Sequence, residues 1–204
     1  GPVPVRRGSR AEDRAPVRVP EPRVVLHALR PGHGQDPPVA EELDVPVHIH
    51  VHETDAEIGE SVRQHGTRPL ARLDRLGLVT ERLLAVHAVH LTAEEIALLA
   101  QRGCTVAHCP ASNLKLASGV APVAALIREG AQVAIGTDGA ASNNRLDLLE
   151  ETRLAALLAK GAGAGLDALA LPAWQALECA TIVAARALGL GERVGSIEVG
   201  KEAD

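Results

Sequence analysis

The sequence is poor in aromatic residues, with one tryptophan and no phenylalanine or tyrosine among its 204 residues. It contains no methionine either. Apolar residues nevertheless make up 46 % of the chain, a normal share for a globular protein. The hydrophobic core must therefore be built from leucine, valine, isoleucine and alanine. A chain of this length suits one domain or slightly more and can bury a real core.

The chain also lacks an excess of positive charge and long apolar runs. Its 21 basic and 26 acidic residues give a net charge of −5, which favours neither nucleic acid nor an anionic membrane surface as a partner. No apolar run approaches the roughly 20 residues of a membrane span. No charged segment followed by an apolar one opens the chain, as a signal peptide would require. We therefore expect no nucleic-acid or membrane partner.

Cysteine is scarce as well. The three cysteines, Cys104, Cys109 and Cys179, are odd in number and form no Cys-x-x-Cys pair. This pattern argues against a disulfide framework and a zinc–thiolate site. It indicates reduced thiols in a cytoplasmic protein.

The composition divides the chain near residue 40. Residues 1–40 are rich in proline and arginine and show neither helical nor strand periodicity, which predicts an irregular or disordered arm. A single strand at residues 23–29 would fit inside it. The regular pattern occupies residues 41–191.

Strands and helices alternate in that regular part. Buried strands are predicted at 45–51, 83–89, 104–110 and 132–138. Helices are predicted at 54–66, 68–77, 92–103, 118–131, 146–161 and 171–191. Four strand–helix units with short connections indicate parallel strands and right-handed crossovers. The α/β fold is then an open doubly wound sheet or part of a (β/α)8 barrel, and no glycine-rich phosphate loop supports the nucleotide-binding version of the open sheet.

Polar residues recur where the predicted strands end. His50, His87, His108 and Asp138 each lie at or near the C-terminal end of a strand, where barrel enzymes place their catalytic groups. Imidazole and carboxylate groups together suit Zn²⁺ or a similar metal. A single histidine would more often be a core residue, and a single aspartate a helix cap. The repetition at one level of successive strands is what indicates a metal site.

Five motifs, in order, resemble those of a known family. They are HIHVHET, LLAVHAVHL, VAHCPASNLKLASGVAPV, AIGTDGAASNN and LGLGERVGSIEVGKEAD. They resemble the C-terminal half of the amidohydrolase superfamily, and most closely its methylthioadenosine/S-adenosylhomocysteine deaminases and their chlorotriazine-hydrolase relatives. The resemblance implies the C-terminal half of a (β/α)8 TIM-type metal-dependent hydrolase barrel, truncated at both ends. Residues 192–204 would begin the return to a small β domain.

The resemblance also implies residue roles. His50 matches a metal ligand, and Asp138 matches a metal ligand that also takes the proton of the hydrolytic water. Glu53 matches the residue that contacts substrate and shuttles a proton, and His87 the residue that holds water and substrate. His108 matches no ligand and is expected to be a structural or wall residue. Because Glu53 would face away from His50 in an ideal strand, its role requires the strand to end or bulge near residue 51.

The implied reaction is hydrolytic deamination of a purine nucleoside or related aminoheterocycle such as adenosine, methylthioadenosine or S-adenosylhomocysteine. One Zn²⁺, or another divalent ion such as Fe²⁺, would serve each site. The family's first-strand His-x-His ligands are absent from this chain, so we expect weak zinc binding. Two alternatives stay open: triazine or other amidohydrolase-type hydrolysis, and a non-catalytic truncated product. Exposed edges of half a barrel would favour association, so a homo-oligomer is a further possibility.

Overall fold

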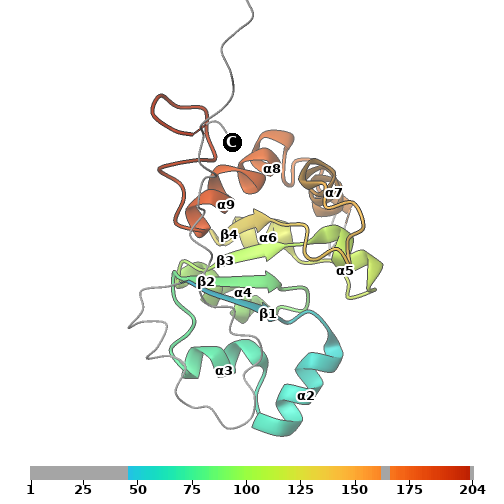
Figure 1. The fold of residues 1–204 in the computed structure, drawn as a ribbon. Coiled ribbons are helices and arrows are strands. Elements are labelled where there is room, and N and C mark those ends of the chain that lie inside the picture. Colours follow the sequence, from blue (N-terminus) through green and yellow to red (C-terminus); the bar gives the residue numbers. More distant parts are fainter. Residues whose placement is uncertain (1–45, 162–165, 203–204) are drawn as a thin grey trace, which may run out of the picture.

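The computed structural model describes residues 46–161 and 166–202. A sheet of four parallel strands lies at its centre, in the order β1-β2-β3-β4 (Figure 1). The strands are β1 (Val47–Val51), β2 (Leu83–His87), β3 (Thr105–His108) and β4 (Gln132–Ile135). This arrangement confirms the predicted parallel units. The arm predicted at residues 1–40 and the strand at 23–29 lie outside the described residues.

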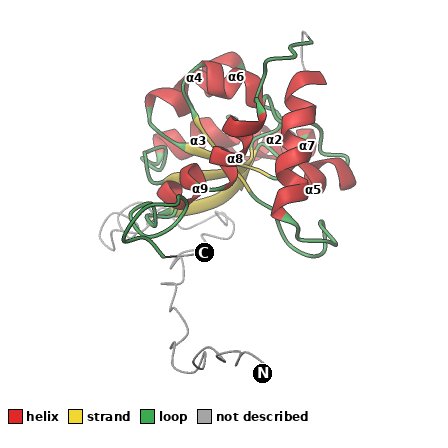
Figure 2. Ribbon diagram, turned by 90° about the horizontal axis from the view of Figure 1, so that it is seen from above, coloured by secondary structure: helices red, strands yellow, loops and turns green. Residues whose placement is uncertain are grey.

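Helices connect and flank the strands. They are α2 (Asp55–His65), α3 (Pro69–Arg75), α4 (Ala93–Gln101), α5 (Pro110–Lys115), α6 (Val123–Arg128), α7 (Leu148–Gly161), α8 (Ala173–Ala180) and α9 (Ile182–Ala187). Figures 1 and 2 agree in placing α4 and α6 on one face of the sheet. No helix among the described residues is both long and apolar enough to cross a membrane.

Local sequence signals begin and end the first long helices. The Thr54 hydroxyl accepts a hydrogen bond from the Glu57 amide at 3.1 Å, and α2 ends at Gly66 in the left-handed conformation. Thr92 and Glu95 form a reciprocal capping box at the start of α4. Both caps follow a local sequence pattern, because a threonine three positions before a glutamate can satisfy amides that the first helical turn leaves without partners.

Strand side chains alternate between two apolar layers. Val47, Ala85 and Val106 belong to the large core that the helices cover, which also contains Leu99 and Leu126. The opposite face carries a small cluster of Leu84, Val86, Ala107 and Cys109, against which Ala187 of α9 packs. β2 and β3 are buried on both faces, which requires nearly continuous apolar strands, whereas β1 alternates apolar residues with histidines and leaves His50 exposed.

The prediction of a single helix at 171–191 is wrong. The chain forms α8 and α9 with a break at Thr181, whose φ of −124° and ψ of −94° are not helical. Its hydroxyl donates to the Leu177 carbonyl at 2.7 Å, and such back-bonding bends helices.

Other bounds also differ from those predicted. β2 ends at His87 and not at residue 89, because the backbone leaves the extended region at this point: His87 and Ala88 have φ values of 70° and 47°, and a strand cannot continue through them. β3 and β4 stop at His108 and Ile135. The helix predicted from residue 118 begins only after Pro122, and α5 was not predicted at all.

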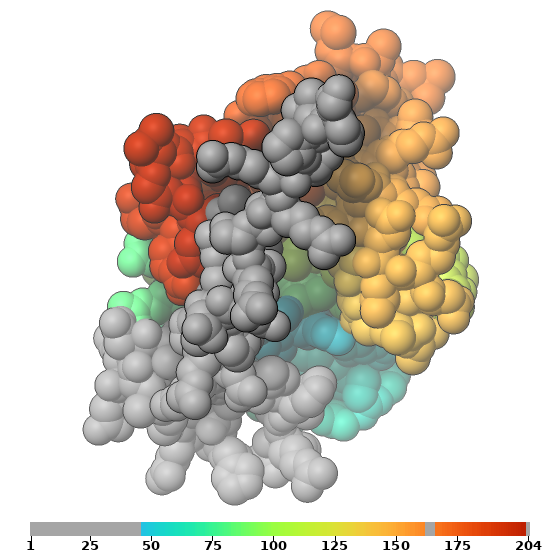
Figure 3. All heavy atoms as spheres, turned by 45° about the horizontal axis from the view of Figure 1, so that its top comes forward, coloured from blue at the N-terminus to red at the C-terminus, as the bar shows by residue number. Residues whose placement is uncertain are grey.

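The last described residues form turns and bends. Arg193 donates two hydrogen bonds to Glu202, at 2.9 and 2.7 Å, across this segment. Ile197 and Val199 within it are fully exposed. In the space-filling view these residues, in red, lie at the surface of the molecule (Figure 3). Whether they begin a small β domain stays a prediction.

The capping box of α4 gives a first prediction. Thr92→Ala removes the side-chain acceptor for the Glu95 amide, and we expect the free energy of unfolding to fall by about 1 kcal/mol in urea titrations. Thr92→Ser keeps an accepting oxygen and should retain most of the stability. An equal loss in both variants would show that the cap contributes nothing.

Candidate active site

The turn after β1 brings its side chains to the C-terminal edge of the sheet. β1 ends at Val51, and His52 follows with a φ of 56°. The strand therefore ends where the role of Glu53 requires it to end, as predicted. A positive φ is uncommon in residues other than glycine and is often found at functional sites.

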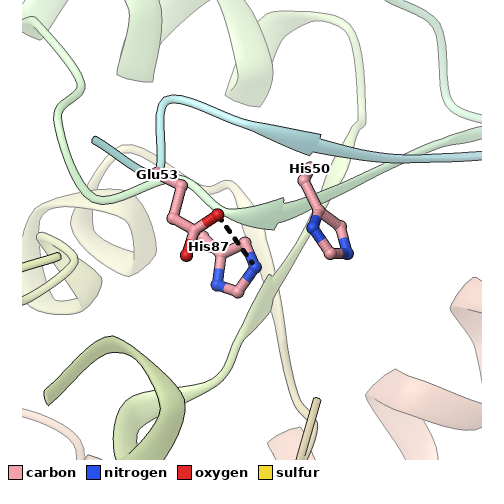
Figure 4. A group of neighbouring side chains, drawn as sticks. All are labelled: His50, Glu53 and His87. Carbon is pink, nitrogen blue, oxygen red and sulfur yellow. Dashed lines mark ion pairs between the residues drawn. The ribbon is translucent and has the colours of Figure 1, made fainter. Parts of the chain in front are cut away.

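Three of the predicted site residues come together at this edge. His50, Glu53 and His87 each offer one nitrogen or oxygen atom, and these atoms all lie within 4.8 Å of one another. Glu53 Oε2 lies 3.7 Å from His87 Nε2 (Figure 4). The His50 and His87 rings are perpendicular, with centroids 4.7 Å apart.

Hydrogen bonding defines how His87 presents its ring. His87 is 1 % exposed, and its Nδ1 lies 2.8 Å from Asn113 Oδ1. Because an amide oxygen only accepts, the proton is assigned to Nδ1. Nε2 then carries a lone pair, is buried, and has no hydrogen-bond partner among the described residues. A buried imidazole lone pair beside a carboxylate and a second imidazole fits a divalent metal or a proton-bearing group.

Asp138 lies just past β4 with a φ of 58° and is not a member of the three-residue group. Its Oδ2 accepts hydrogen bonds from the Ser112 and Ser142 hydroxyls at 2.6 and 2.7 Å. Burial alone would raise the pKa of Asp138, but these hydrogen bonds and the nearby His87 outweigh it and lower the pKa below its usual value. Asp138 is therefore an ionised carboxylate, suited to bind a cation or accept a proton.

A buried carboxylate anchors the loop that carries Asp138. Glu151 on α7 is 1 % exposed and accepts hydrogen bonds from the Ala111 amide at 3.0 Å and Asn143 Nδ2 at 2.9 Å. Asn143 Nδ2 also donates to the Thr137 carbonyl at 2.9 Å. Burial raises the pKa of Glu151 despite these bonds. The loop between β4 and α7 is thus tied to α5.

Sequence reasoning missed the residues that orient the site. Ser112 and Asn113, both on α5, hold Asp138 and His87, and Ser118 donates to Glu53 Oε1 at 3.3 Å. All three belong to the SNLKLASG stretch, which the sequence resemblance singled out without assigning them roles. His108 is buried, and neither ring nitrogen has a hydrogen-bond partner among the described residues. Its expected wall role stays a prediction.

The chain is similar to known proteins over most of its length. The sequence model of the amidohydrolase family matches residues 25–204. The 5-methylthioadenosine/S-adenosylhomocysteine deaminase of Moorella thermoacetica is 54 % identical over 162 residues, which are 79 % of this chain and 37 % of that protein.

Solved structures are similar over the same region. A zinc-bound adenosine deaminase from Xanthomonas campestris is 60 % identical with a TM-score of 0.78, covering 81 % of this chain and 37 % of its own. A zinc complex of atrazine chlorohydrolase from Arthrobacter aurescens is 34 % identical with a TM-score of 0.76, covering 82 % and 37 %. The likeness confirms the predicted part of an amidohydrolase barrel. The chain spans little more than a third of the length of these relatives.

His108 gives a prediction about pH. Burial, and secondarily His87, lower the pKa of His108 to about 4, whereas an unfolded histidine has a pKa of about 6.5. Between these values the unfolded chain binds a proton that the folded chain does not. The free energy of unfolding should therefore fall by about 3 kcal/mol in total as the pH drops from 6.5 to 4, with the full contribution present above pH 6.5.

The measurement is urea unfolding at several pH values between 7 and 4. His108→Asn removes this titration, so its stability should decline less steeply than that of the wild type over this window. Parallel pH profiles for the two proteins would contradict the prediction.

Proposed function

The chain belongs to the amidohydrolase family, and on that premise we propose that it carries the metal-dependent hydrolytic deamination of an aminoheterocycle of the adenosine, methylthioadenosine or S-adenosylhomocysteine type. One observation carries the proposal. The Glu53 carboxylate faces the buried, unbonded Nε2 of His87 at 3.7 Å, next to His50. This arrangement suits proton transfer from the Glu53 carboxyl group to a ring nitrogen of a substrate that lies against both side chains.

His50 and Asp138 would hold the metal, Zn²⁺ or another divalent ion such as Fe²⁺, one per site. Imidazole nitrogen and ionised carboxylate oxygen are ordinary zinc ligands, and the lowered pKa of Asp138 keeps it ionised. The group of His50, Glu53 and His87 offers an alternative ligand set. We favour Asp138 because the resemblance implies it as the metal ligand and leaves the Glu53 carboxylate to transfer a proton to the substrate. When bound, the ion would supply water with a pKa near 7.

The side chains of the chain itself divide the remaining work. Glu53 would give a proton to a ring nitrogen, which makes the carbon bearing the amine more electrophilic. His87 would hold the water and substrate through Nε2, with its ring fixed by Asn113. Asp138 would accept one proton of the water and pass it to the amine, which leaves as ammonia when its bond to the ring carbon breaks, while Glu53 regains a proton from the added hydroxyl. Each general acid–base step of this kind typically contributes about 10²–10⁴-fold to the rate.

The similarities favour a deaminase over the alternatives. The relatives named as deaminases are 54 % and 60 % identical to this chain, whereas the atrazine chlorohydrolase is 34 % identical. Triazine hydrolysis is the second candidate function, and a non-catalytic product the third. Under the first candidate the partners are a small aminoheterocycle and water. Three buried cysteines without disulfides support the proposal of a reducing, cytoplasmic location, and a homo-oligomer stays a proposal.

Metal binding gives a direct prediction. Only two of the ligands implied by the resemblance lie in this chain, so we expect the purified 204-residue chain to lose zinc on dialysis and to retain well under one ion per chain. His50→Asn should abolish the residual binding in calorimetric titrations, whereas His65→Asn, on α2, should leave it unchanged. Tight one-to-one zinc in the wild type would overturn this expectation.

A chimaera tests the reaction itself. Residues 46–202 would replace the matching segment of the Xanthomonas campestris deaminase, and loss of adenine absorbance would be followed with adenosine, methylthioadenosine and S-adenosylhomocysteine. We expect the chimaera to bind zinc and to turn over at least one of these substrates. Glu53→Gln should lower its rate by about 10²–10⁴-fold. Turnover of triazines alone would favour the second function. A folded, inactive chimaera would favour the third.

A further inference from the structure

Residues outside the cluster of His50, Glu53 and His87 form hydrogen bonds with both the backbone and the carboxylate of Glu53. We infer that Glu57 and Ser118 are positioning residues that fix which oxygen of Glu53 faces His87. The inference rests on the proposed function in taking Glu53 as the proton-transfer residue. The contacts themselves do not depend on that function.

Glu57 holds the backbone of the turn. Its Oε2 accepts a hydrogen bond from the Glu53 amide at 2.8 Å, and its Oε1 accepts one from the His52 amide at 3.1 Å. These two amides follow directly on the end of β1, where His52 has a φ of 56°. One carboxylate group therefore satisfies two consecutive amides in an uncommon backbone conformation. The Glu57 amide in turn donates to Thr54 Oγ1 at 3.1 Å, which keeps Glu57 over the turn.

The imidazole of His52 pins the same turn to the neighbouring elements. Its Nε2 accepts a hydrogen bond from the Leu70 amide at 3.0 Å. Its Nδ1 lies 3.1 Å from the His90 carbonyl and 3.0 Å from an Arg68 guanidinium nitrogen. His52 is fully buried. The peptide that carries Glu53 thus has little freedom to move.

Ser118 holds the carboxylate. It is 5 % exposed, and its hydroxyl donates to Glu53 Oε1 at 3.3 Å. Its carbonyl lies 2.8 Å from His90 Nε2, and His90 Nδ1 lies 3.3 Å from Asp55 on α2. This histidine therefore links the serine segment to the helix that follows Glu53.

The backbone around Ser118 allows little alternative placement. Ala117 and Gly119 have φ values of 57° and 124°. A Cβ atom on Gly119 would lie 2.8 Å from Cγ1 of Val89, so a side chain there would collide with the core beside the site. The backbone conformation consequently restricts where the Ser118 hydroxyl can lie.

The hydrogen bonds that hold Glu53 give its two carboxylate oxygens different roles. Oε1 is engaged as the acceptor of the Ser118 hydroxyl, and Oε2 faces Nε2 of His87 at 3.7 Å. A proton carried by Glu53 then resides on Oε2, on the side of His87 and His50. Without Ser118 the carboxylate could rotate, and misplacement by about 1 Å can cost up to 10²-fold in rate.

The first test does not depend on activity. A double-mutant cycle with Ser118→Ala and Glu53→Ala in the 204-residue chain would be measured by urea unfolding. We expect the two changes to be coupled by about fivefold in the unfolding equilibrium constant, as for a partly buried hydrogen bond to a carboxylate. Ser61→Ala is the matched control, because the Ser61 hydroxyl binds the Thr67 carbonyl, and it should show no coupling to Glu53.

Amide hydrogen exchange tests the backbone grip in the same chain. Glu57→Gln leaves one accepting oxygen for two amides, so exchange at residues 52 and 53 should quicken by about tenfold. Glu60→Gln, on the same helix but exposed, should leave both rates unchanged. The inference would be overturned, whatever the activity, if the effects of Ser118→Ala and Glu53→Ala on the free energy of unfolding were additive. Unaltered amide hydrogen exchange in Glu57→Gln would overturn it as well.

Kinetic measurements on a form of the protein that turns over substrate separate an effect on positioning from an effect on folding. Ser118→Ala should lower kcat about tenfold with KM within twofold, and Ser118→Thr should restore it. An unchanged kcat in Ser118→Ala would also overturn the inference. Coupling and altered exchange without turnover in any form of the protein would instead count against the proposed function and leave the positioning contacts established.

Discussion

The parallel pairing of the four strands is the constraint on which the site depends. In the β1–β2 ladder Val51 lies opposite His87, and His50 lies opposite Val86. Because parallel strands begin and end at common levels, the last residue of β2 stands level with the last residue of β1. Glu53, two residues further on, can then reach back to His87. A shift of one residue in this register would turn every strand side chain to the other face and separate the cluster.

The C-terminal edge of the sheet is held by polar side chains from helices rather than by the strands alone. Glu57 of α2 binds the turn after β1, and Asn113 of α5 fixes the ring of His87. Glu151 of α7 ties α5 to the loop that carries Asp138. Hydrogen bonds buried in this way are costly to break and strengthen one another. They preorganise charged groups, which is the condition under which electrostatic stabilisation of a reaction is largest.

The apolar core packs the sheet against the helices without phenylalanine, tyrosine or a buried tryptophan. Trp174 is 71 % exposed, and the largest fully buried apolar side chains are leucines and valines. Branched aliphatic side chains fill the space between sheet and helices with well-defined rotamers. The predicted core composition is confirmed. The histidines buried among these residues lose hydration, which explains the low pKa of His108.

The sequence by itself determined the order of the four strands, the threonine caps and the candidate residues His50, Glu53, His87 and Asp138, since these follow from local periodicity, capping patterns and motifs. The tertiary structure decided where strands stop, the break at Thr181, and the contacts of Ser118 and Glu57 with Glu53. Such contacts join residues through backbone conformations and hydrogen bonds set by packing between distant segments, and no local pattern encodes them. The sequence thus named the chemical groups, and the fold selected which atoms of those groups face one another.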